Sequence, residues 1–337
     1  MRVLVTGATG FVGSHSAEAL AAAGHALRLL VRDRAKAERV LAGRRLGAPE
    51  LVVGDVTDAA SVARALDGCD AALHAAAVVA LEAHRADEAR RTNAHGVEVV
   101  LGEAARRKLG SIVYVSSAAA LCVPGGPRIC ADSPVAPATS PYARSKAEAE
   151  GFARGLLEAG APLRVSYPVG VVGPDDPGLS EMNHTLQVLV RDFIALTSSG
   201  ISVVDVRDLA QVHAALVAGR AAPGGYVVGG HFLRWGEVAE LLERLTGRRL
   251  RKLPLPGALL RAAGRVGDGV KRFASFDFPL TLEAMTFATQ WPGADAVATS
   301  AATGVRFRDP AESIADALRS LARAGHLRAD QIGRLAA

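Results

Sequence analysis

The amino-acid sequence predicts an α/β protein built on a Rossmann-type, doubly wound parallel sheet. Over the first half of the chain, short runs rich in valine and leucine alternate with alanine-rich helical stretches, which is the pattern of βαβ units. A glycine-rich turn follows the first of those runs. With 337 residues, half of them hydrophobic, the chain is also long enough to bury a full core.

The elements of this sheet can be placed in order along the chain. Each expected strand is a short apolar run, and each gap between strands is filled by a segment with helical periodicity. Right-handed crossovers would join successive strands. The expected strands are residues 2–6, 26–31, 51–53, 71–74, 112–115 and 163–167, and the expected helices are residues 11–23, 59–66, roughly 85–108 and 141–159.

The turn after the first strand has the spacing Gly-x-x-Gly-x-x-Gly. Glycines in such a turn allow the backbone to approach a pyrophosphate closely, and the next helix directs its N-terminal amides toward it. The strand before the turn and the helix after it are both present, so we expect a dinucleotide site rather than glycines that serve turn geometry alone. Its expected contact residues are Gly7, Thr9, Gly10, Phe11, Val12 and Gly13.

The tip of the second strand is where a dinucleotide fold selects its cofactor. An acidic residue there binds the ribose 2′-hydroxyl, whereas arginine accommodates a 2′-phosphate. Val31 occupies the usual acidic position and Arg32 follows it, which favours NADP over NAD because a guanidinium can clamp a phosphate. Asp33 leaves the NAD alternative open if the register slips by one residue, and Arg32 as a plain surface charge is a third interpretation.

The second half of the chain has a weaker pattern, with Gly/Pro-rich turns and isolated helices such as residues 235–246. We expect residues 1–170 to form the dinucleotide-binding domain and residues 171–337 to form most of a smaller substrate-binding lobe. Two short apolar runs, 201–204 and 226–228, are expected to return to the sheet. The lobe would then be partly interleaved with the first domain.

Two further patterns suggest acid/base chemistry. Tyr142 and Lys146 are four residues apart on an expected helix and therefore lie on one face of it. A free phenol has a pKa of about 10, and a nearby ammonium favours the phenolate, so such a pair can exchange protons near neutrality. Ser116 and Ser117 end the fifth strand, where one hydroxyl could donate to a substrate carbonyl oxygen. Strand-end capping is the alternative role for either serine.

Seven motifs in this order resemble those of the extended short-chain dehydrogenases/reductases, in the NAD-dependent epimerase/dehydratase family. The resemblance covers most of the chain. The motifs are Thr6-Gly7-Ala8-Thr9-Gly10-Phe11-Val12-Gly13, Gly54-Asp55-Val56-Thr57-Asp58, Leu73-His74-Ala75-Ala76-Ala77, Thr92-Asn93-Ala94-His95-Gly96, Ser116-Ser117-Ala118, Tyr142-x-x-x-Lys146 and Gly173-Pro174.

The resemblance implies a role for each matching residue. Ser117 would polarise the substrate oxygen, Tyr142 would be the acid/base, and Lys146 would hold the nicotinamide ribose and make Tyr142 a better proton donor. It also implies a homodimer in which helices 85–108 and 141–159 pack against their copies. The further cofactor contacts that it implies are Asp55 and Val56 at the adenine, Ala75, Ala76 and Ala77 between the cofactor's halves, and Pro168 beside the nicotinamide.

The segment after the sixth strand departs from the pattern of nucleotide-sugar enzymes in this family. Those members typically carry Arg-Pro-x-x-Val-Tyr-Gly-Pro, but residues 167–174 read Tyr-Pro-Val-Gly-Val-Val-Gly-Pro. With Leu30-Val31-Arg32-Asp33 and Val204-Asp205-Val206-Arg207-Asp208, the chain is similar to the dihydroflavonol-reductase-like branch. Members of that branch reduce ketones or aldehydes with NADPH, or oxidise 3β-hydroxysteroids with NAD.

The resulting expectation is an NAD(P)-dependent oxidoreductase, with NADPH-dependent reduction of a small-molecule ketone or aldehyde, or the reverse alcohol oxidation, as the reaction. One alternative is a nucleotide-sugar epimerase or dehydratase with tightly bound NAD. Another is a non-catalytic dinucleotide sensor, although a sensor would not need Ser117, Tyr142 and Lys146.

Composition excludes several other classes of protein. The 39 Lys and Arg exceed the 34 Asp and Glu by only 5 and are spread along the chain, and aromatic residues are scarce, so nucleic acid is not an expected partner. Cys69, Cys122 and Cys130 have no CxxC spacing and predict neither disulfides nor a zinc site. The scattered histidines suggest no metal. The odd cysteine count and the lack of an 18-residue apolar run indicate a cytoplasmic protein without a membrane-spanning segment.

Overall fold

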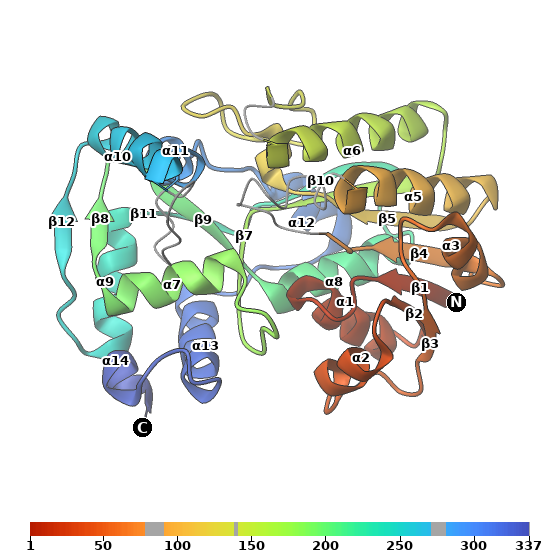
Figure 1. The fold of residues 1–337 in the computed structure, drawn as a ribbon, viewed down its shortest axis with the longest axis horizontal. Coiled ribbons are helices and arrows are strands. Elements are labelled where there is room, and N and C mark those ends of the chain that lie inside the picture. The colour runs from red at the N-terminus through yellow and green to blue at the C-terminus, as the bar shows by residue number, and fades with distance from the viewer. Residues whose placement is uncertain (78–90, 138–140, 271–280, 337) are drawn as a thin grey trace.

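A seven-stranded sheet forms the centre of the larger half of the molecule (Figure 1). The computed structural model describes residues 1–77, 91–137, 141–270 and 281–336. All neighbouring strands in the sheet are parallel, in the order β10-β6-β5-β4-β1-β2-β3, which confirms the predicted fold class. The strands are β1 (Arg2–Thr6), β2 (Ala26–Val31), β3 (Glu50–Val53), β4 (Ala71–His74), β5 (Ser111–Val115), β6 (Leu163–Pro168) and β10 (Gly224–Val228).

Helices cover both faces of this sheet, which explains why its central strands are buried on both sides and rich in apolar residues. Figure 1 shows α5 and α6 on one side of the sheet and α1 and α8 on the other. Every residue of β5 and β6 is buried. The helices of this half are α1 (Phe11–Ala22), α2 (Arg34–Leu41), α3 (Ala59–Leu66), α5 (Gly96–Arg106), α6 (Pro141–Glu158), α8 (Val206–Val217) and α12 (Val297–Thr303), with short turns at η2 (Arg91–His95) and η3 (Ala118–Leu121).

Two of these helices differ from the expectation. The segment expected as one helix over residues 85–108 is a π-helical turn, η2, followed by α5, and residues 85–90 lie outside the described part of the chain. Helix α2 was not expected; half of its eight residues are charged, and only Ala37 is buried. It begins where the Asp33 carboxylate accepts a hydrogen bond from the Lys36 amide at 3.0 Å, which is a side-chain N-cap.

A smaller lobe, on the left in Figure 1, has its own hydrophobic core around two short sheets. Val172, Leu189, Val203 and Leu242 are among the residues buried there. The strands are β7 (Gly170–Val172), β9 (Gly200–Asp205) and β11 (His231–Arg234) in one sheet and β8 (Ile194–Leu196) and β12 (Lys252–Pro254) in the other, and the helices are α7 (Glu181–Arg191), α9 (Trp235–Thr246), α10 (Gly257–Val270), α11 (Leu282–Gln290), α13 (Pro310–Arg323), α14 (Ala329–Ile332) and η4 (Gly333–Ala336).

The chain crosses between the two halves more than once. Residues 224–228 return to the large sheet as β10, beside β6, as the apolar run over 226–228 predicts. Residues 200–205 instead form β9, which pairs with β7 and β11 in the lobe. Gly200 permits this pairing, since a Cβ at that position would lie 2.1 Å from the Leu233 carbonyl oxygen. Only one of the two returning runs therefore joins the large sheet.

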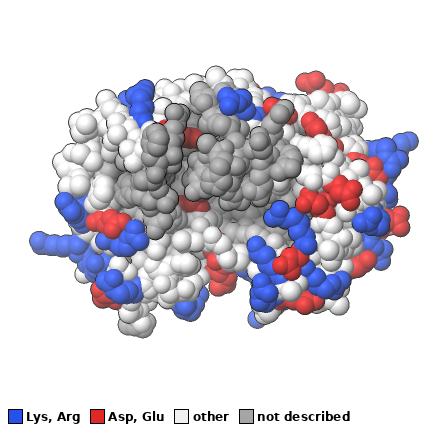
Figure 2. All heavy atoms as spheres, viewed as in Figure 1, with Lys and Arg blue, Asp and Glu red and all other residues white. Residues whose placement is uncertain are grey.

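The charges at the surface and the hydrophobicity of the helices are consistent with the modest net charge and the apolar content of the sequence. Positive and negative side chains are interspersed over the face in Figure 2. Within the described ranges, no helix is both long enough and apolar enough to cross a bilayer.

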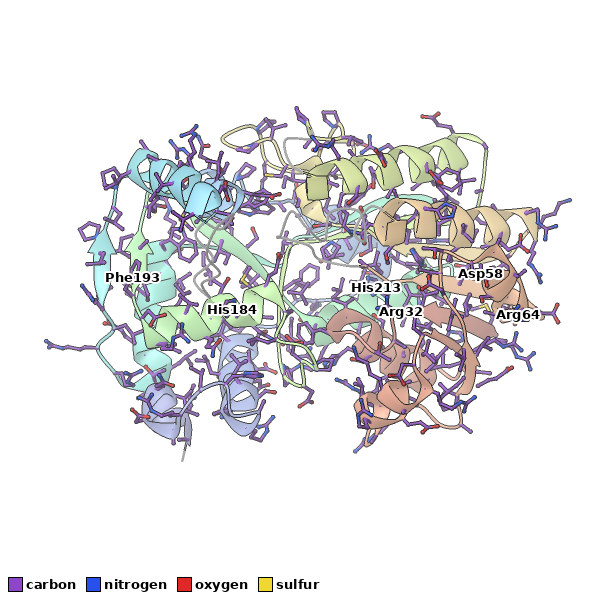
Figure 3. The ribbon with its side chains drawn as sticks, viewed as in Figure 1. Arg32, Asp58, Arg64, His184, Phe193 and His213 are labelled. Atoms are coloured by element: carbon purple, nitrogen blue, oxygen red, sulfur yellow. The ribbon has the colours of Figure 1, made fainter. Side chains whose placement is uncertain are left out.

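A fully buried histidine ties α8 to α1 and β6. His213 Nδ1 lies 2.8 Å from the Ser16 hydroxyl, and its Nε2 lies 3.0 Å from the Ser166 hydroxyl. Figure 3 places His213 in the interior of the larger half. Burial lowers the pKa of His213 to about 3, because the charged imidazolium would lose its hydration. His74 is likewise buried with a pKa of about 3, and burial lowers the pKa of His15 to about 4.

These neutral histidines predict that the fold loses stability in weak acid. The unfolded chain takes up protons near pH 6.5 while the folded protein does not, so the free energy of unfolding falls as pH drops from 6.5 toward 4. We expect the urea midpoint to be clearly lower at pH 5 than at pH 7.5.

A matched pair of variants tests the source of that slope. His213→Gln removes one buried titrating group while its amide can still bond both serines, so the pH dependence of the urea midpoint should become shallower. His95→Gln, on an exposed side chain, should leave it unchanged. A wild-type midpoint that is equal at pH 5 and pH 7.5 would contradict the prediction.

Candidate active site

The glycine turn lies between β1 and α1 and is packed too tightly for side chains. Gly7 has a positive φ of 75°, and a Cβ there would lie 2.6 Å from the backbone of Ala75 and Ala76. A Cβ on Gly13 would lie 2.1 Å from the Gly7 carbonyl oxygen. These contacts close the turn into a backbone-lined cradle at the carboxyl end of β1.

Helix α1 opens toward this cradle with its first amides free of a side-chain cap. Its N-cap is Gly10, which offers no capping side chain, and its first turn carries no acidic residue. An uncapped, uncharged N-terminus of a 12-residue helix is suited to a negatively charged ligand, since the helix dipole and the unpaired amides both favour an anion. A dinucleotide pyrophosphate therefore fits the residues present.

The strand tip after β2 shows where Arg32 and Asp33 lie. The strand ends at Val31, paired with Val53 of β3, and Arg32 follows as an exposed residue in the half of the molecule that carries β1 to β4 (Figure 3). Asp33 is occupied as the N-cap of α2. The side chain of Asp33 thus caps α2, whereas the side chain of Arg32 is exposed directly after Val31.

The next strand ends carry the other expected cofactor contacts. After β3, the Asp55 carboxylate accepts hydrogen bonds from the Thr57 amide at 2.9 Å and hydroxyl at 2.8 Å, and Val56 is buried. After β4, Ala75 and Ala76 donate their amides to Thr6. The Thr6 bonds tie the segment after β4 to the end of β1, and the Asp55 bonds fix the local turn after β3.

At the end of β5 the structure separates the two serines. Ser116 is buried, and its hydroxyl donates to Glu150 Oε2 at 3.1 Å. Ser117 is half-buried and caps η3, where its oxygen accepts a hydrogen bond from the Ala119 amide at 3.2 Å. An accepting hydroxyl oxygen keeps its own proton for donation, so Ser117 can serve both as a cap and as a donor to a ligand.

Helix α6 brings Tyr142 and Lys146 to the same side of the sheet. Tyr142 lies in the first turn of the helix, and its side chain is outside the described atoms. Lys146 is 5% exposed, and burial lowers the pKa of its ammonium to about 8, although the carboxylates of Glu150 and Glu181 favour the charged form. A lysine with such a pKa can change charge near neutral pH.

Glu150 was missed by sequence reasoning, although its position could have revealed it. It lies one turn after Lys146 on the same face of α6 and is fully buried. The spacing of four residues from Lys146 and eight from Tyr142 was the available signal. Its contacts with three other residues are visible only in the folded chain.

The last expected contact, Pro168, ends β6 beside Val228 of β10 and is buried. The turn at Gly173 that follows β7 is held by Asn183 of α7, whose side chain bonds both the amide and the carbonyl of Gly173. Within the described residues, no three His, Cys, Asp or Glu side chains are grouped as a metal ion would require.

Comparison with known proteins places the chain in a family. Residues 3–229 match the model of the NAD dependent epimerase/dehydratase family, and the chain belongs to this family. It is an NAD(P)-dependent enzyme of the extended short-chain dehydrogenase/reductase type, as the seven motifs predict.

Several known proteins within this similarity can be named. The chain is 31% identical to the 4-hydroxy-2-methyl-3-oxo-4-farnesyl-3,4-dihydroquinoline-1-oxide ketoreductase of Stigmatella aurantiaca, over 81% of each protein. It is 29% identical to sterol demethylase protein B of Methylococcus capsulatus, over 81% of this chain and 83% of the relative. The crystal structure of gox2253 aligns with a TM-score of 0.80 at 27% identity, covering 97% of this chain and 99% of the other. Other curated relatives include a protein of the dihydroflavonol 4-reductase type, in agreement with the predicted branch.

Proposed function

We propose that this protein is an NADPH-dependent carbonyl reductase that reduces a ketone or aldehyde on a small molecule, or oxidises the corresponding alcohol. The observation that carries the proposal is the convergence, at one edge of the sheet, of the glycine cradle after β1, Ser117 after β5 and the Lys146 face of α6. The similarity to a ketoreductase supports the same reaction class.

Each residue has a distinct proposed task. The hydroxyl of Ser117 donates to the substrate carbonyl oxygen, and Tyr142 delivers a proton to that oxygen as it gains negative charge. Lys146 binds the ribose next to the nicotinamide and, while charged, favours proton release from Tyr142. The dinucleotide supplies the hydride when it is bound. The smaller lobe, to which most of residues 171–337 belong, would select the substrate.

The cradle and the strand ends are proposed to hold the dinucleotide. Gly7, Gly10 and Gly13 keep side chains away from the pyrophosphate, and the amides of Thr9, Phe11 and Val12 belong to the same turn and helix start. Asp55 and Val56 would contact the adenine, Ala75 to Ala77 would line the middle of the cofactor, and Pro168 would lie beside the nicotinamide.

The preference for NADPH is proposed to depend on Arg32. Arg32 is exposed directly after the end of β2, so its guanidinium can reach a 2′-phosphate, while the Asp33 carboxylate caps α2 with one oxygen. Arg32→Ala is expected to weaken NADPH binding by about 10- to 100-fold, the loss of one charge-assisted contact, while NADH binding stays nearly unchanged. Fluorescence titration of each nucleotide measures both affinities.

The control is Arg39→Ala, which removes the same charge from an exposed position in the last turn of α2. It should leave both affinities at their wild-type values. Equal loss of NADPH and NADH affinity in Arg32→Ala would contradict a role at the 2′-phosphate.

If the reaction is instead nucleotide-sugar epimerisation or dehydration, the nucleotide titration is expected to give a different result. An epimerase that re-reduces its own substrate would be purified with NAD that does not exchange. Residues 167–174 lack the arginine and the tyrosine that are typical of nucleotide-sugar enzymes, which argues against this alternative. A cytoplasmic location remains a prediction from the cysteine content and the lack of a long apolar run, and a homodimer through helices 85–108 and 141–159 remains a prediction of the family resemblance.

A further inference from the structure

The side chain of Glu150 is a fully buried charged group beneath the proposed catalytic face of α6. It has no exposed surface, and the proposed chemistry assigns it no role. A carboxylate so far from water costs several kcal/mol unless it is well compensated. Its hydrogen-bond partners therefore indicate what role it has at this position.

Three elements converge on this carboxylate. The Ser116 hydroxyl, at the end of β5, donates to Oε2 at 3.1 Å. The Tyr167 hydroxyl of β6 donates to Oε1, and Arg154 Nε of α6 donates to the same oxygen at 3.0 Å. Both oxygens are thus engaged, and the bonds join α6 to the carboxyl ends of the two strands beside it.

The contact with Ser116 bears directly on Ser117, the next residue. The Ser116 amide also donates to the Ser166 carbonyl of β6 at 2.8 Å, so both its backbone and its hydroxyl are held. Ser117 leaves the strand from this anchored position, which restricts where its own hydroxyl can lie relative to α6.

The charge of Glu150 acts on Lys146, one turn away. Burial works against the Lys146 ammonium, and Glu150 favours the protonated form, as does Glu181 of α7. His74 of β4 also faces Lys146, but its pKa of about 3 keeps it neutral above pH 5. Among the described residues, Glu150 and Glu181 are therefore the carboxylates that favour this buried positive charge.

We propose that Glu150 is a positioning residue for the reaction, which holds the Ser117 end of β5 against α6 and keeps the Lys146 ammonium charged. The inference rests on the proposed function, because the charge of Lys146 matters only if it serves a bound dinucleotide and Tyr142. It adds to that function a buried residue that touches neither substrate nor cofactor.

The test is the pH dependence of NADPH binding, which needs no substrate. In the wild type, affinity should fall at alkaline pH as Lys146 loses its proton. Glu150→Gln removes the nearby negative charge, so this fall should move to lower pH by about one unit. Among the described neighbours of Glu150, Tyr114, Tyr167 and Arg154 do not titrate between pH 6 and 9, because burial raises the pKa values of the two tyrosines and Arg154 stays charged.

Two further variants separate positioning from general effects. Glu148→Gln makes the same charge change at an exposed position two residues away on α6, and it should not move the alkaline fall. Glu150→Asp keeps the charge but withdraws the carboxylate from Ser116, so the fall should stay near its wild-type pH while kcat for carbonyl reduction drops. Glu150→Asp also carries the test if Glu150→Gln does not fold.

The outcomes are distinguishable. An alkaline fall in Glu150→Gln that moves no more than in Glu148→Gln would overturn the inference while leaving the proposed function intact. So would a Glu150→Asp variant with wild-type kcat. A wild-type protein that binds neither NADPH nor NADH would overturn both.

Discussion

Tyr142→Phe is expected to lower kcat for carbonyl reduction by about 10²- to 10⁴-fold, the usual loss when a positioned proton donor is removed. The substitution deletes one hydroxyl from the first turn of α6 and leaves the ring in place. NADPH affinity should therefore change little, because the cradle after β1 and Lys146 are untouched. Stopped-flow or steady-state consumption of NADPH, with fluorescence titration in parallel, measures both quantities.

The matched control is Tyr226→Phe, which removes a phenol from β10 at the edge of the sheet. The Tyr226 hydroxyl donates to the Ala222 carbonyl at 2.6 Å, a local contact within the connection that leads into the strand. This variant should keep wild-type turnover. If Tyr142→Phe also retained near wild-type turnover, the acid/base assignment would be wrong, and a different donor would have to protonate the substrate oxygen.

Gly13→Ala is expected to weaken NADPH binding by about 100-fold or more and to destabilise the fold by about 1–3 kcal/mol. A Cβ at Gly13 would lie 2.1 Å from the Gly7 carbonyl oxygen and 2.6 Å from its carbon. Both atoms are backbone, so relief requires the whole turn to shift. That shift would misalign the amides at the start of α1 with a pyrophosphate.

Gly236→Ala provides the contrast for this substitution. Gly236 lies in the first turn of α9, and a Cβ there would meet no atom within 4 Å in the described structure. It should be neutral or slightly stabilising, since alanine is the better helix former. Equal NADPH affinity in Gly13→Ala and the wild type would mean that the turn after β1 does not hold the cofactor. Nucleotide titration and a urea unfolding curve on each variant decide the matter.

The chemistry of the strand ends could be predicted in part from the sequence. The glycine spacing, the Tyr142 and Lys146 pair and the serines after β5 are local patterns, and the structure brings their backbone segments to one edge of the sheet. Arg32 and Asp33 could not be separated in this way. Their roles depend on where β2 ends. In the folded chain the Asp33 carboxylate caps α2.

The sequence alone determined the Rossmann-type sheet, its six predicted strands and the glycine turn, because apolar periodicity and turn chemistry are properties of neighbouring residues. Only the tertiary structure decided that β10 lies beside β6 and that β9 does not join the large sheet. It also decided that Ser116, not Ser117, faces the buried Glu150. These are contacts between residues far apart in the chain, and their choice depends on packing and buried charge, which leave no local pattern to read.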